Sequence, residues 1–195
     1  MSTNDDTREA LIEAAMELLL ERGPDAIGLR AVARHAGLSH SAPYRHFDNH
    51  DDLLCAVAER GCRQLWERCV HAQSSSGEDA RARFQAIGVT YMCFAWEHPG
   101  RFRVMFSEVA AGSDAVRSAQ ASIFALASSA IAAAQRQGHF IQDEPQELAL
   151  VAWSGVHGYA QLRLGGLVSW LGMDHEDPVE LARRVTRKLF LGLRA

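Results

Sequence analysis

The sequence contains no long hydrophobic run, and this absence argues against a membrane-spanning segment. Its longest nearly apolar stretch, residues 123–134, is interrupted by Ser128 and Ser129 and is shorter than the ~18 residues that a transmembrane helix needs. The first residues, MSTNDDTREAL, are polar and acidic, unlike a secretory signal peptide. We therefore expect a cytoplasmic protein that has no membrane partner.

The sequence also lacks the residue groupings that catalytic and metal sites require. Its 4 cysteines include no CxxC pair and its 9 histidines no HExxH spacing, so no zinc site is indicated. A nucleophile elbow at Ser154 would need a glycine two residues earlier, which is missing. No glycine-rich phosphate loop is present. We therefore expect no enzyme activity, no cofactor and no bound metal.

Strand-like alternation is nearly absent, whereas helical periodicity extends through most of the 195 residues. The hydrophobic content of 48% and the charged content of 23% are typical of a globular protein. Gly23-Pro24 should end the first helix, and the serine-rich stretch at residues 74–77 is a flexible break. We predict an all-α fold with helices over residues 7–22, 29–36, 39–47, 51–72, 78–98, 99–106, 113–137, 145–164 and 178–193.

The charge distribution is uneven, although the net charge of −4 by itself argues weakly against a nucleic-acid partner. The first 60 residues are acidic overall, yet residues 26–47 contain no Asp or Glu. The same window contains Arg30, Arg34 and Arg45, with three histidines beside them. A local excess of basic residues of this kind is typical of a DNA-binding segment.

Two short helical patterns in this window are joined by a turn that contains Gly37, as in a helix-turn-helix. Gly37 is suited to end the first helix, and Ser39 can cap a second helix that runs to Phe47. Val32, Ala33, Leu38 and Phe47 would form the small core. An ordinary helical hairpin without a DNA partner fits the same pattern. In the DNA-binding interpretation, the second helix exposes to a groove the side chains of His40, Ser41, Tyr44 and Arg45.

The stretch LRAVARHAGLSHSAPYRHFDNHDDL, residues 29–53, resembles the DNA-binding signature of TetR-family transcriptional repressors. Downstream, His98-Pro99 and then Trp153 with His157-Gly158 resemble one C-terminal class of that family, which is named for Trp and His-Gly (WHG). The resemblance implies a three-helix helix-turn-helix domain, which we place at residues 5–65. It also implies a larger helical domain for effector binding and dimerisation, which we place at residues 66–195.

The resemblance implies roles for individual residues, which divide into DNA-positioning and base-specifying contacts. Tyr44 and His46 would bind phosphates, although Tyr44 could pack its ring and His46 could lie at the core edge. Gly28 stands where the family usually has Ser or Thr, and His50 where it often has Lys, so the phosphate grip is expected to be weak. We expect Arg34 to pair with an acid of the first helix. The expected DNA-binding set is Arg30, Ser39, His40, Ser41, Tyr44, Arg45, His46 and His50.

Three cysteines, Cys55, Cys62 and Cys69, recur at steps of seven residues and share one stripe of the helix at 51–72. Their Cα atoms would be ~10.5 Å apart, which is too far for a disulfide within the helix. We interpret them as small buried hydrophobic residues. The alternative is a thiol sensor that pairs with Cys93 or with a partner chain.

The last two helical patterns favour a homodimer. Residues 148–153 are six consecutive apolar residues, so this helix should be buried on more than one side. A stripe on the final helix matches it, although an intramolecular core could bury the same residues. The TetR resemblance implies a four-helix seam between two copies. The stripe consists of Val179, Ala182, Val185, Leu189 and Leu193.

Aromatic residues at helical spacing in the second domain suit an effector cavity, in which apolar walls carry a few polar tips. Trp153 and His157 share a helix face because they are four residues apart. A plain aromatic core explains the same residues. The resemblance implies an effector site here, and we expect a small hydrophobic or aromatic effector. The expected ligand-binding residues are Phe84, Tyr91, Phe94, Phe102, Met105, Phe106, Phe124, Trp153 and His157.

These interpretations predict a ligand-responsive transcriptional repressor that binds a palindromic operator in double-stranded DNA as a homodimer. The alternative is a helical protein that binds or sequesters a small molecule and retains a vestigial DNA-binding motif. The acidic N-terminal balance and His50 favour that alternative.

Overall fold

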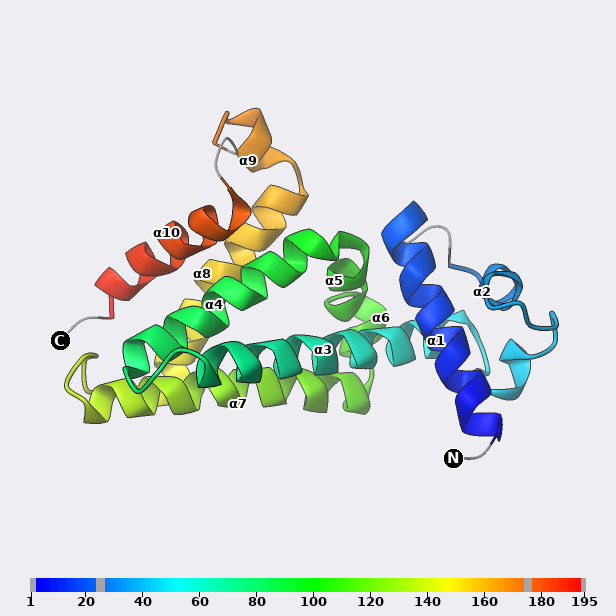
Figure 1. The fold of residues 1–195 in the computed structure, drawn as a ribbon, viewed down its shortest axis with the longest axis horizontal. Helices are drawn as coiled ribbons and strands as arrows, with labels where there is room; N and C mark the ends of the chain where they lie inside the picture. The colour runs from blue at the N-terminus through cyan, green and yellow to red at the C-terminus, as the bar shows by residue number, and fades with distance from the viewer. Residues whose placement is uncertain (1–2, 24–26, 174–176, 194–195) are drawn as a thin grey trace. The chain divides into compact units, whose positions relative to one another are not determined.

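The computed structural model describes residues 3–23, 27–173 and 177–193, and within these ranges the fold is all-α, as the sequence predicted (Figure 1). The described part of the chain contains no helix long and apolar enough to cross a membrane. The elements are α1 Thr3–Arg22, α2 Leu29–His35, the 3-10 turn η2 Pro43–Arg45, α3 His50–Ser74, α4 Ala80–Glu97, α5 Pro99–Met105, α6 Glu108–Ala111, α7 Asp114–Arg136, α8 Pro145–Leu164, α9 Leu167–Trp170 and α10 Pro178–Leu191.

Most predicted helices are confirmed to within a few residues, and α8 has the predicted bounds. The sequence analysis missed the two four-residue helices, α6 and α9. Helix α1 ends where Gly23 adopts a φ of 80°, a left-handed conformation that glycine reaches without strain. Pro24, which was expected to help end this helix, lies outside the described residues.

The chain forms two compact units, and each is described by itself. The first consists of Met1–Arg63 and His98–Ala119, and the second of Gln64–Glu97 and Gln120–Ala195. Val32, Ala33 and Phe47, three of the four residues expected to form the small N-terminal core, are buried in the first unit, whereas the fourth, Leu38, is half-buried. Helix α5 approaches α1 closely there, because a Cβ atom on Gly100 would lie 2.8 Å from the carbonyl oxygen of Leu19.

Ion pairs hold α1, α2 and α3 together in the first unit. Arg60 of α3 pairs with both Glu9 and Glu13 of α1, the second contact being 2.9 Å from Nη1 to Oε1. Glu17 of α1 lies 2.9 Å from Nε2 of His35 in α2. These three glutamates of α1 thus bind residues of neighbouring helices. Their spacing of four residues aligns them along the helix face that the two neighbouring helices contact.

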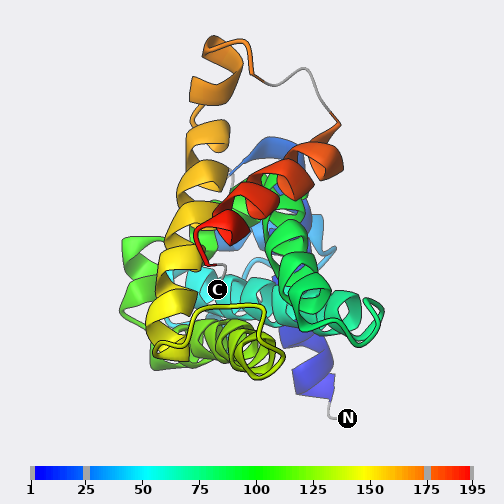
Figure 2. The same ribbon diagram turned by 90° about the vertical axis from the view of Figure 1, so that its left-hand side faces the viewer.

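In the second unit, α10 packs against α4 and α8 (Figure 2). Two glycines allow this approach: a Cβ on Gly88 of α4 would lie 2.9 Å from Cγ2 of Thr186, and one on Gly155 of α8 would lie 2.7 Å from Cδ2 of Leu189. The apolar stripe of α10, which was expected at a dimer seam, therefore mostly faces its own unit. Its members Ala182 and Leu193 are buried. Exposed apolar side chains lie instead on α8, at Leu150 and Val151, and at the end of α9, at Trp170.

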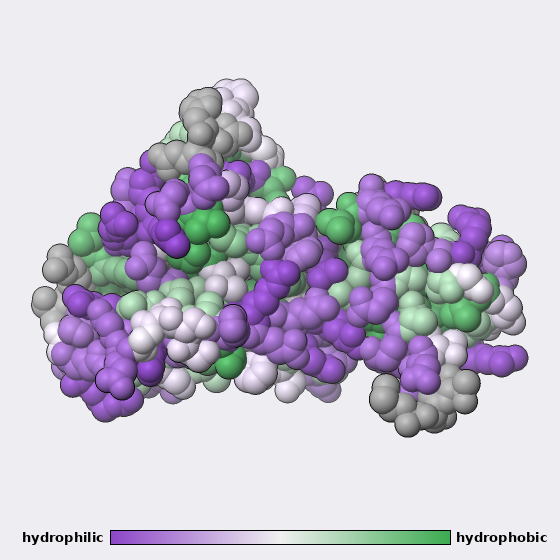
Figure 3. Space-filling view, viewed as in Figure 1, coloured by the Kyte–Doolittle hydropathy of each residue, from purple (hydrophilic) through white to green (hydrophobic). Residues whose placement is uncertain are grey.

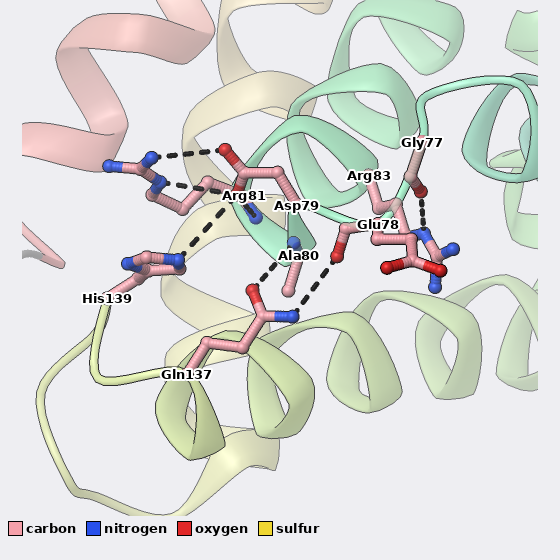
Figure 4. Close-up of polar contacts among 8 residues, drawn as sticks. All are labelled: Gly77, Glu78, Asp79, Ala80, Arg81, Arg83, Gln137 and His139. Carbon is pink, nitrogen blue, oxygen red and sulfur yellow. Dashed lines mark hydrogen bonds and ion pairs between the residues drawn. The ribbon is translucent and has the colours of Figure 1, made fainter.

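The start of α4 is fixed by polar contacts with the residue after α7 and with His139 (Figure 4). The side-chain amide of Gln137 donates to the carbonyl of Glu78 at 3.1 Å and accepts the backbone N–H of Ala80 at 3.0 Å. Asp79 accepts the backbone N–H of Arg81 at 2.9 Å and pairs with the Arg81 guanidinium, 3.1 Å from Nη2. The side-chain hydrogen bond from Arg81 is the main reason that the pKa of Asp79 is lowered.

We predict that Asp79→Asn lowers the free energy of unfolding by about 0.5 kcal/mol at pH 7, since Asn can still cap the helix and the exposed ion pair contributes little. Because the pKa of Asp79 is lower in the folded protein than its unfolded value of about 3.9, the stabilisation is present above that value. It is lost as the pH falls through the folded pKa. Urea unfolding between pH 7 and pH 3 measures this difference.

The matched control is Glu78→Gln, which removes the neighbouring negative charge and leaves Arg81 its carboxylate. Its effect should be smaller than that of Asp79→Asn at pH 7. A difference between wild type and Asp79→Asn that stays constant down to pH 3 would contradict the assignment of the lowered pKa to this contact.

Candidate functional site

The segment expected to form a helix-turn-helix contains one α-helix, α2, followed by a much shorter element than predicted. Gly37 ends α2 with a φ of 68°, as expected. The predicted second helix over residues 39–47 is wrong, because only Pro43–Arg45 is helical and it forms a single 3-10 turn. Ser39 does not cap it, and its Oγ lies 3.2 Å from Oγ of Ser41 instead.

Pro43 explains the shortened element. Proline has no N–H to donate to the carbonyl four residues earlier, and its ring crowds that carbonyl. The backbone uses tighter bonds instead, from the N–H of Ala42 to the carbonyl of Ser39 at 3.0 Å and from that of Arg45 to the carbonyl of Ala42 at 3.2 Å. Such i to i+3 bonds define a 3-10 helix.

The expected DNA-binding side chains are mostly accessible. Tyr44 is 54% exposed. Its ring is therefore not buried in the core of the first unit. His46 is half-buried, and its ring centroid lies 6.4 Å from that of Phe47, so it lies at the edge of the core. The remaining members of the set are exposed: Arg30, Ser39, His40, Ser41, Arg45 and His50.

Three exposed arginines of this segment have no acidic partner in the part of the chain that the structure describes: Arg30, Arg34 and Arg45. In the described ranges none of the three forms an ion pair. The expectation that Arg34 pairs with an acid of the first helix is therefore wrong, because Glu17 binds the neighbouring His35. Exposed guanidinium groups and an exposed phenol such as that of Tyr44 are suited to bind phosphate oxygens.

His50 has an intramolecular partner that the sequence did not indicate. Its Nε2 lies 2.7 Å from the carbonyl oxygen of Ile27, and its Nδ1 lies 3.7 Å from the carboxylate of Asp51. The imidazole thus joins Ile27, two residues before the start of α2, to the start of α3. A phosphate contact from His50 would have to compete with these partners.

A small apolar cavity of about 40 Å³ lies within the second unit, between α4, α7 and α8. Three of the nine expected ligand-binding residues, Phe84, Tyr91 and Trp153, form part of its wall. The sequence analysis missed the small side chains that leave the space open. For Ala149, Ala152 and Val156 the sequence signal was the spacing of small residues along one face of α8, rather than the spacing of aromatic residues. The missed residues are Ile87, Gly88, Ile123, Ala127, Ala149, Ala152 and Val156.

The other six expected residues do not line this cavity. His157 lies behind Tyr91, Phe124 packs on Trp153 with ring centroids 5.6 Å apart, and Phe94 is fully buried. The last three belong to the first unit, where they contribute to its core or its edge: Phe102, Met105 and Phe106.

Polar groups at the cavity wall satisfy one another. The indole N–H of Trp153 donates to the hydroxyl of Tyr91 at 3.0 Å, and that hydroxyl lies 2.7 Å from Nδ1 of His157. With its oxygen accepting from Trp153, Tyr91 is placed to donate its proton to Nδ1, which assigns the imidazole proton to Nε2. Burial lowers the pKa of His157, which favours this neutral form. The cavity is therefore almost purely apolar.

Two of the three cysteines in the α3 stripe are buried, and Cys55 is half-buried. Cys62 and Cys69 are buried, and burial raises the pKa of each thiol to about 12. Burial also raises the pKa of Cys93, to about 11. Because the thiolate is the reactive form, these pKa values favour a packing role. Among the described residues, no group of three or more His, Cys, Asp or Glu could hold a metal ion.

Two family models match the chain. Residues 84–189 match the model described as the Tetracyclin repressor-like, C-terminal domain. Residues 11–57, which contain α2, the 3-10 turn and the start of α3, match the model described as Bacterial regulatory proteins, tetR family.

Solved structures share the fold over nearly the whole chain. A protein of unknown function from Rhodococcus sp. RHA1 is 30% identical, with a TM-score of 0.82 over 97% of this chain and 96% of that one. A TetR family transcription regulator from Marinobacter aquaeolei VT8 is 20% identical, with a TM-score of 0.72 over 100% and 99%. RolR in complex with resorcinol is 17% identical, with a TM-score of 0.69 over 97% and 88%.

We predict that Cys62→Ala destabilises the protein by about 1 kcal/mol through lost packing. Because its thiol is buried and protonated at neutral pH, Cys62 should react with a thiol reagent only after unfolding. Reaction rates in buffer and in concentrated urea measure this. Cys55→Ala is the control. Because Cys55 is only half-buried, this substitution should lower the free energy of unfolding by less than Cys62→Ala does. Rapid labelling of Cys62 in the folded protein would support a thiol sensor instead.

Proposed function

The chain belongs to the TetR family of bacterial regulatory proteins, and from that premise we propose that it is a ligand-responsive repressor. In this proposal it binds a palindromic operator as a homodimer and releases it when a small effector binds. The observation that carries the DNA-binding part is the acid-free surface of Arg30, Arg34 and Arg45, exposed and without ion pairs in the described ranges. A regulator of this kind works in the cytoplasm, where it meets the chromosome, and needs no enzyme activity.

We assign the DNA contacts by chemistry and position. Tyr44 and His46 would bind phosphates, Arg30 and Arg45 would supply charge or base contacts, and Ser39, His40 and Ser41 would meet base edges from the turn before η2. These groups lie on or next to a short 3-10 turn rather than a full recognition helix. The proposed DNA-binding domain is residues 5–65, and the proposed effector and dimerisation domain is residues 66–195.

The exposed face of α8 supports dimerisation. Leu150 and Val151 are 60% and 64% exposed. Leu162, about three turns further along α8, is also exposed. Leu191 of α10 adds a further exposed apolar side chain. Exposed apolar side chains grouped on one helix face mark a protein interface. We propose that α8 and α10 of each copy form a four-helix seam in which these residues are covered.

The effector is proposed to be apolar or aromatic and to bind in the cavity beside Tyr91 and Trp153. RolR, which shares the fold, is a complex with the aromatic ligand resorcinol. The cavity of about 40 Å³ is smaller than the ~150 Å³ that accommodates benzene in a protein core, so binding must enlarge it. We propose that the second domain belongs to the WHG class, on the basis of Trp153, His157 and Gly158. Trp153 and His157 of this motif both contact the hydroxyl of Tyr91, so the motif also has a structural role.

A sequestering protein with a vestigial motif is the second candidate, and the engagement of His50 by Ile27 favours it. It predicts effector binding without DNA binding. The repressor and the sequestering protein therefore differ in the DNA-binding experiment described next. Both are expected to bind an effector in the experiment that follows it.

The DNA-binding prediction concerns the region upstream of the protein's own gene. We expect the logarithm of affinity to fall with the logarithm of salt concentration with a slope that reflects roughly 4–8 phosphates per dimer. Tyr44→Phe should weaken binding about fivefold by removing one hydrogen bond to phosphate, and Arg45→Ala should reduce the salt slope by about 2 per dimer. Fluorescence anisotropy with a labelled duplex measures both quantities.

Arg136→Ala is the matched control, because Arg136 is exposed and lies in the second unit. It should change neither affinity nor slope. A slope near zero, or equal behaviour of all three variants, would support the vestigial motif.

The effector prediction uses reciprocity between the two ligands. If an effector lowers operator affinity 100-fold, the coupling is about 2.7 kcal/mol, and operator DNA must weaken effector binding by the same factor. Titration of a screened aromatic ligand, followed by tryptophan fluorescence with and without operator, measures this. Ala152→Leu should block binding by filling the cavity, whereas Ala125→Leu, at an exposed position of α7, should not. Equal ligand affinities with and without operator would show that the cavity is not the switch.

A further inference from the structure

A second hollow in the second unit is separate from the proposed effector cavity. It is a groove of about 370 Å³ bordered by α10, by α4 and by the end of α3 with the residues that follow it. This volume lies in the range of ~300–1,000 Å³ that is usual for small-molecule sites. The apolar cavity has about 40 Å³. The groove is therefore the only one of these two that can admit a metabolite without rearrangement.

Helix α4 separates the groove from the cavity. Phe84, Ile87 and Tyr91 of α4 line the cavity, whereas Ala82, Ala86 and Val89 line the groove. At 100° per residue these two sets lie on opposite faces of the helix. The groove is thus a separate site, and a ligand there would contact none of the residues assigned to the effector.

The groove wall on α10 carries two guanidinium groups, Arg183 and Arg187, one helical turn apart. Arg183 pairs with Glu180, 2.6 Å from Nη1 to Oε1. Arg187 forms no ion pair or hydrogen bond with any described side chain. Since no acidic residue lines the groove, Arg187 leaves it with a net positive charge. In Figure 3 hydrophilic residues lie over part of α10, with hydrophobic residues among them, and white to pale green residues lie below them over part of α4.

The opposite wall and floor combine a fixed polar group with apolar surface. Gln85 donates from Nε2 to the carbonyl of Arg183 and to Oγ1 of Thr186, both at 3.3 Å, which holds this stretch of α10 against α4. Thr90 and Ser76 add hydroxyl groups to the lining. Alanine and valine side chains of α4 form the apolar part. The groove thus has a cationic rim, carried by a helix that Gln85 holds against α4, and an apolar floor.

We propose that this groove binds a small amphiphilic anion, a carboxylate or phosphate joined to a short apolar group, with the anion held by Arg183 and Arg187. Two guanidinium groups one turn apart can share the oxygens of one such anion through charge-assisted hydrogen bonds. The apolar part of the ligand lies on Ala82, Ala86 and Val89. This binding does not depend on DNA recognition or on the effector cavity.

The test is isothermal titration calorimetry on the full chain without DNA, with benzoate, phenyl phosphate, inorganic phosphate and neutral benzamide as probes. We expect benzoate or phenyl phosphate to bind at least about tenfold more tightly than benzamide, since the neutral amide forgoes the charge-assisted bonds. The stronger of the two anions identifies the head group. Inorganic phosphate should bind more weakly than phenyl phosphate, because it leaves the apolar floor in contact with water.

Arg187→Gln should weaken binding of the preferred anion at least about tenfold, and Arg183→Gln/Arg187→Gln should abolish it. Lys188→Gln is the matched control, because Lys188 is an exposed cation on the same helix that does not line the groove. It should bind like wild type. Thermal unfolding of each variant checks that the exposed substitutions leave the fold intact.

Four results would overturn the proposal. The first is no binding of any anion at millimolar concentration, and the second is equal affinity of benzamide and both aromatic anions. The third is equal loss in Lys188→Gln and Arg187→Gln, which would indicate a diffuse charge effect. Binding that Ala152→Leu blocks and Arg187→Gln does not would place the anion in the apolar cavity, which also overturns it.

Discussion

The second unit depends on the close packing of α10 over two glycines. Gly88 of α4 and Gly155 of α8 lie against Thr186 and Leu189, where any larger side chain would collide. This packing buries Ala182 and Leu193 of the apolar stripe of α10, whereas Leu150 and Val151 of α8 stay exposed. It also sets the position of α4, whose two faces border the apolar cavity and the cationic groove.

The two hollows differ because their polar groups are used differently. At the cavity, the polar atoms of Tyr91, Trp153 and His157 bind one another, so that an entering ligand meets apolar surface. At the groove, Arg187 has no partner in the described part of the chain, and its charge is available. An apolar effector and an amphiphilic anion are therefore complementary to different sides of one helix. Ligand at either site would act on α4, which both share.

In the first unit, charge is divided between structure and recognition. The acidic face of α1 is paired with Arg60 and His35, and this pairing orients the neighbouring helices. The basic side chains that follow have no such partners and stay exposed in the described ranges. The overall negative charge of the chain is thus compatible with DNA binding, because three acids of α1 are already bound to other residues of the unit.

The sequence by itself determined the all-α fold, most helix bounds and the family, because helical periodicity and the residue 29–53 motif are local patterns. It did not predict that Pro43 reduces the second motif helix to one 3-10 turn, since the balance between proline and its neighbours depends on how the segment packs. Nor could it separate cavity-lining residues from plain core, or show that Glu17 binds His35 rather than Arg34. Those outcomes depend on which helix faces meet, and only the tertiary structure decides that.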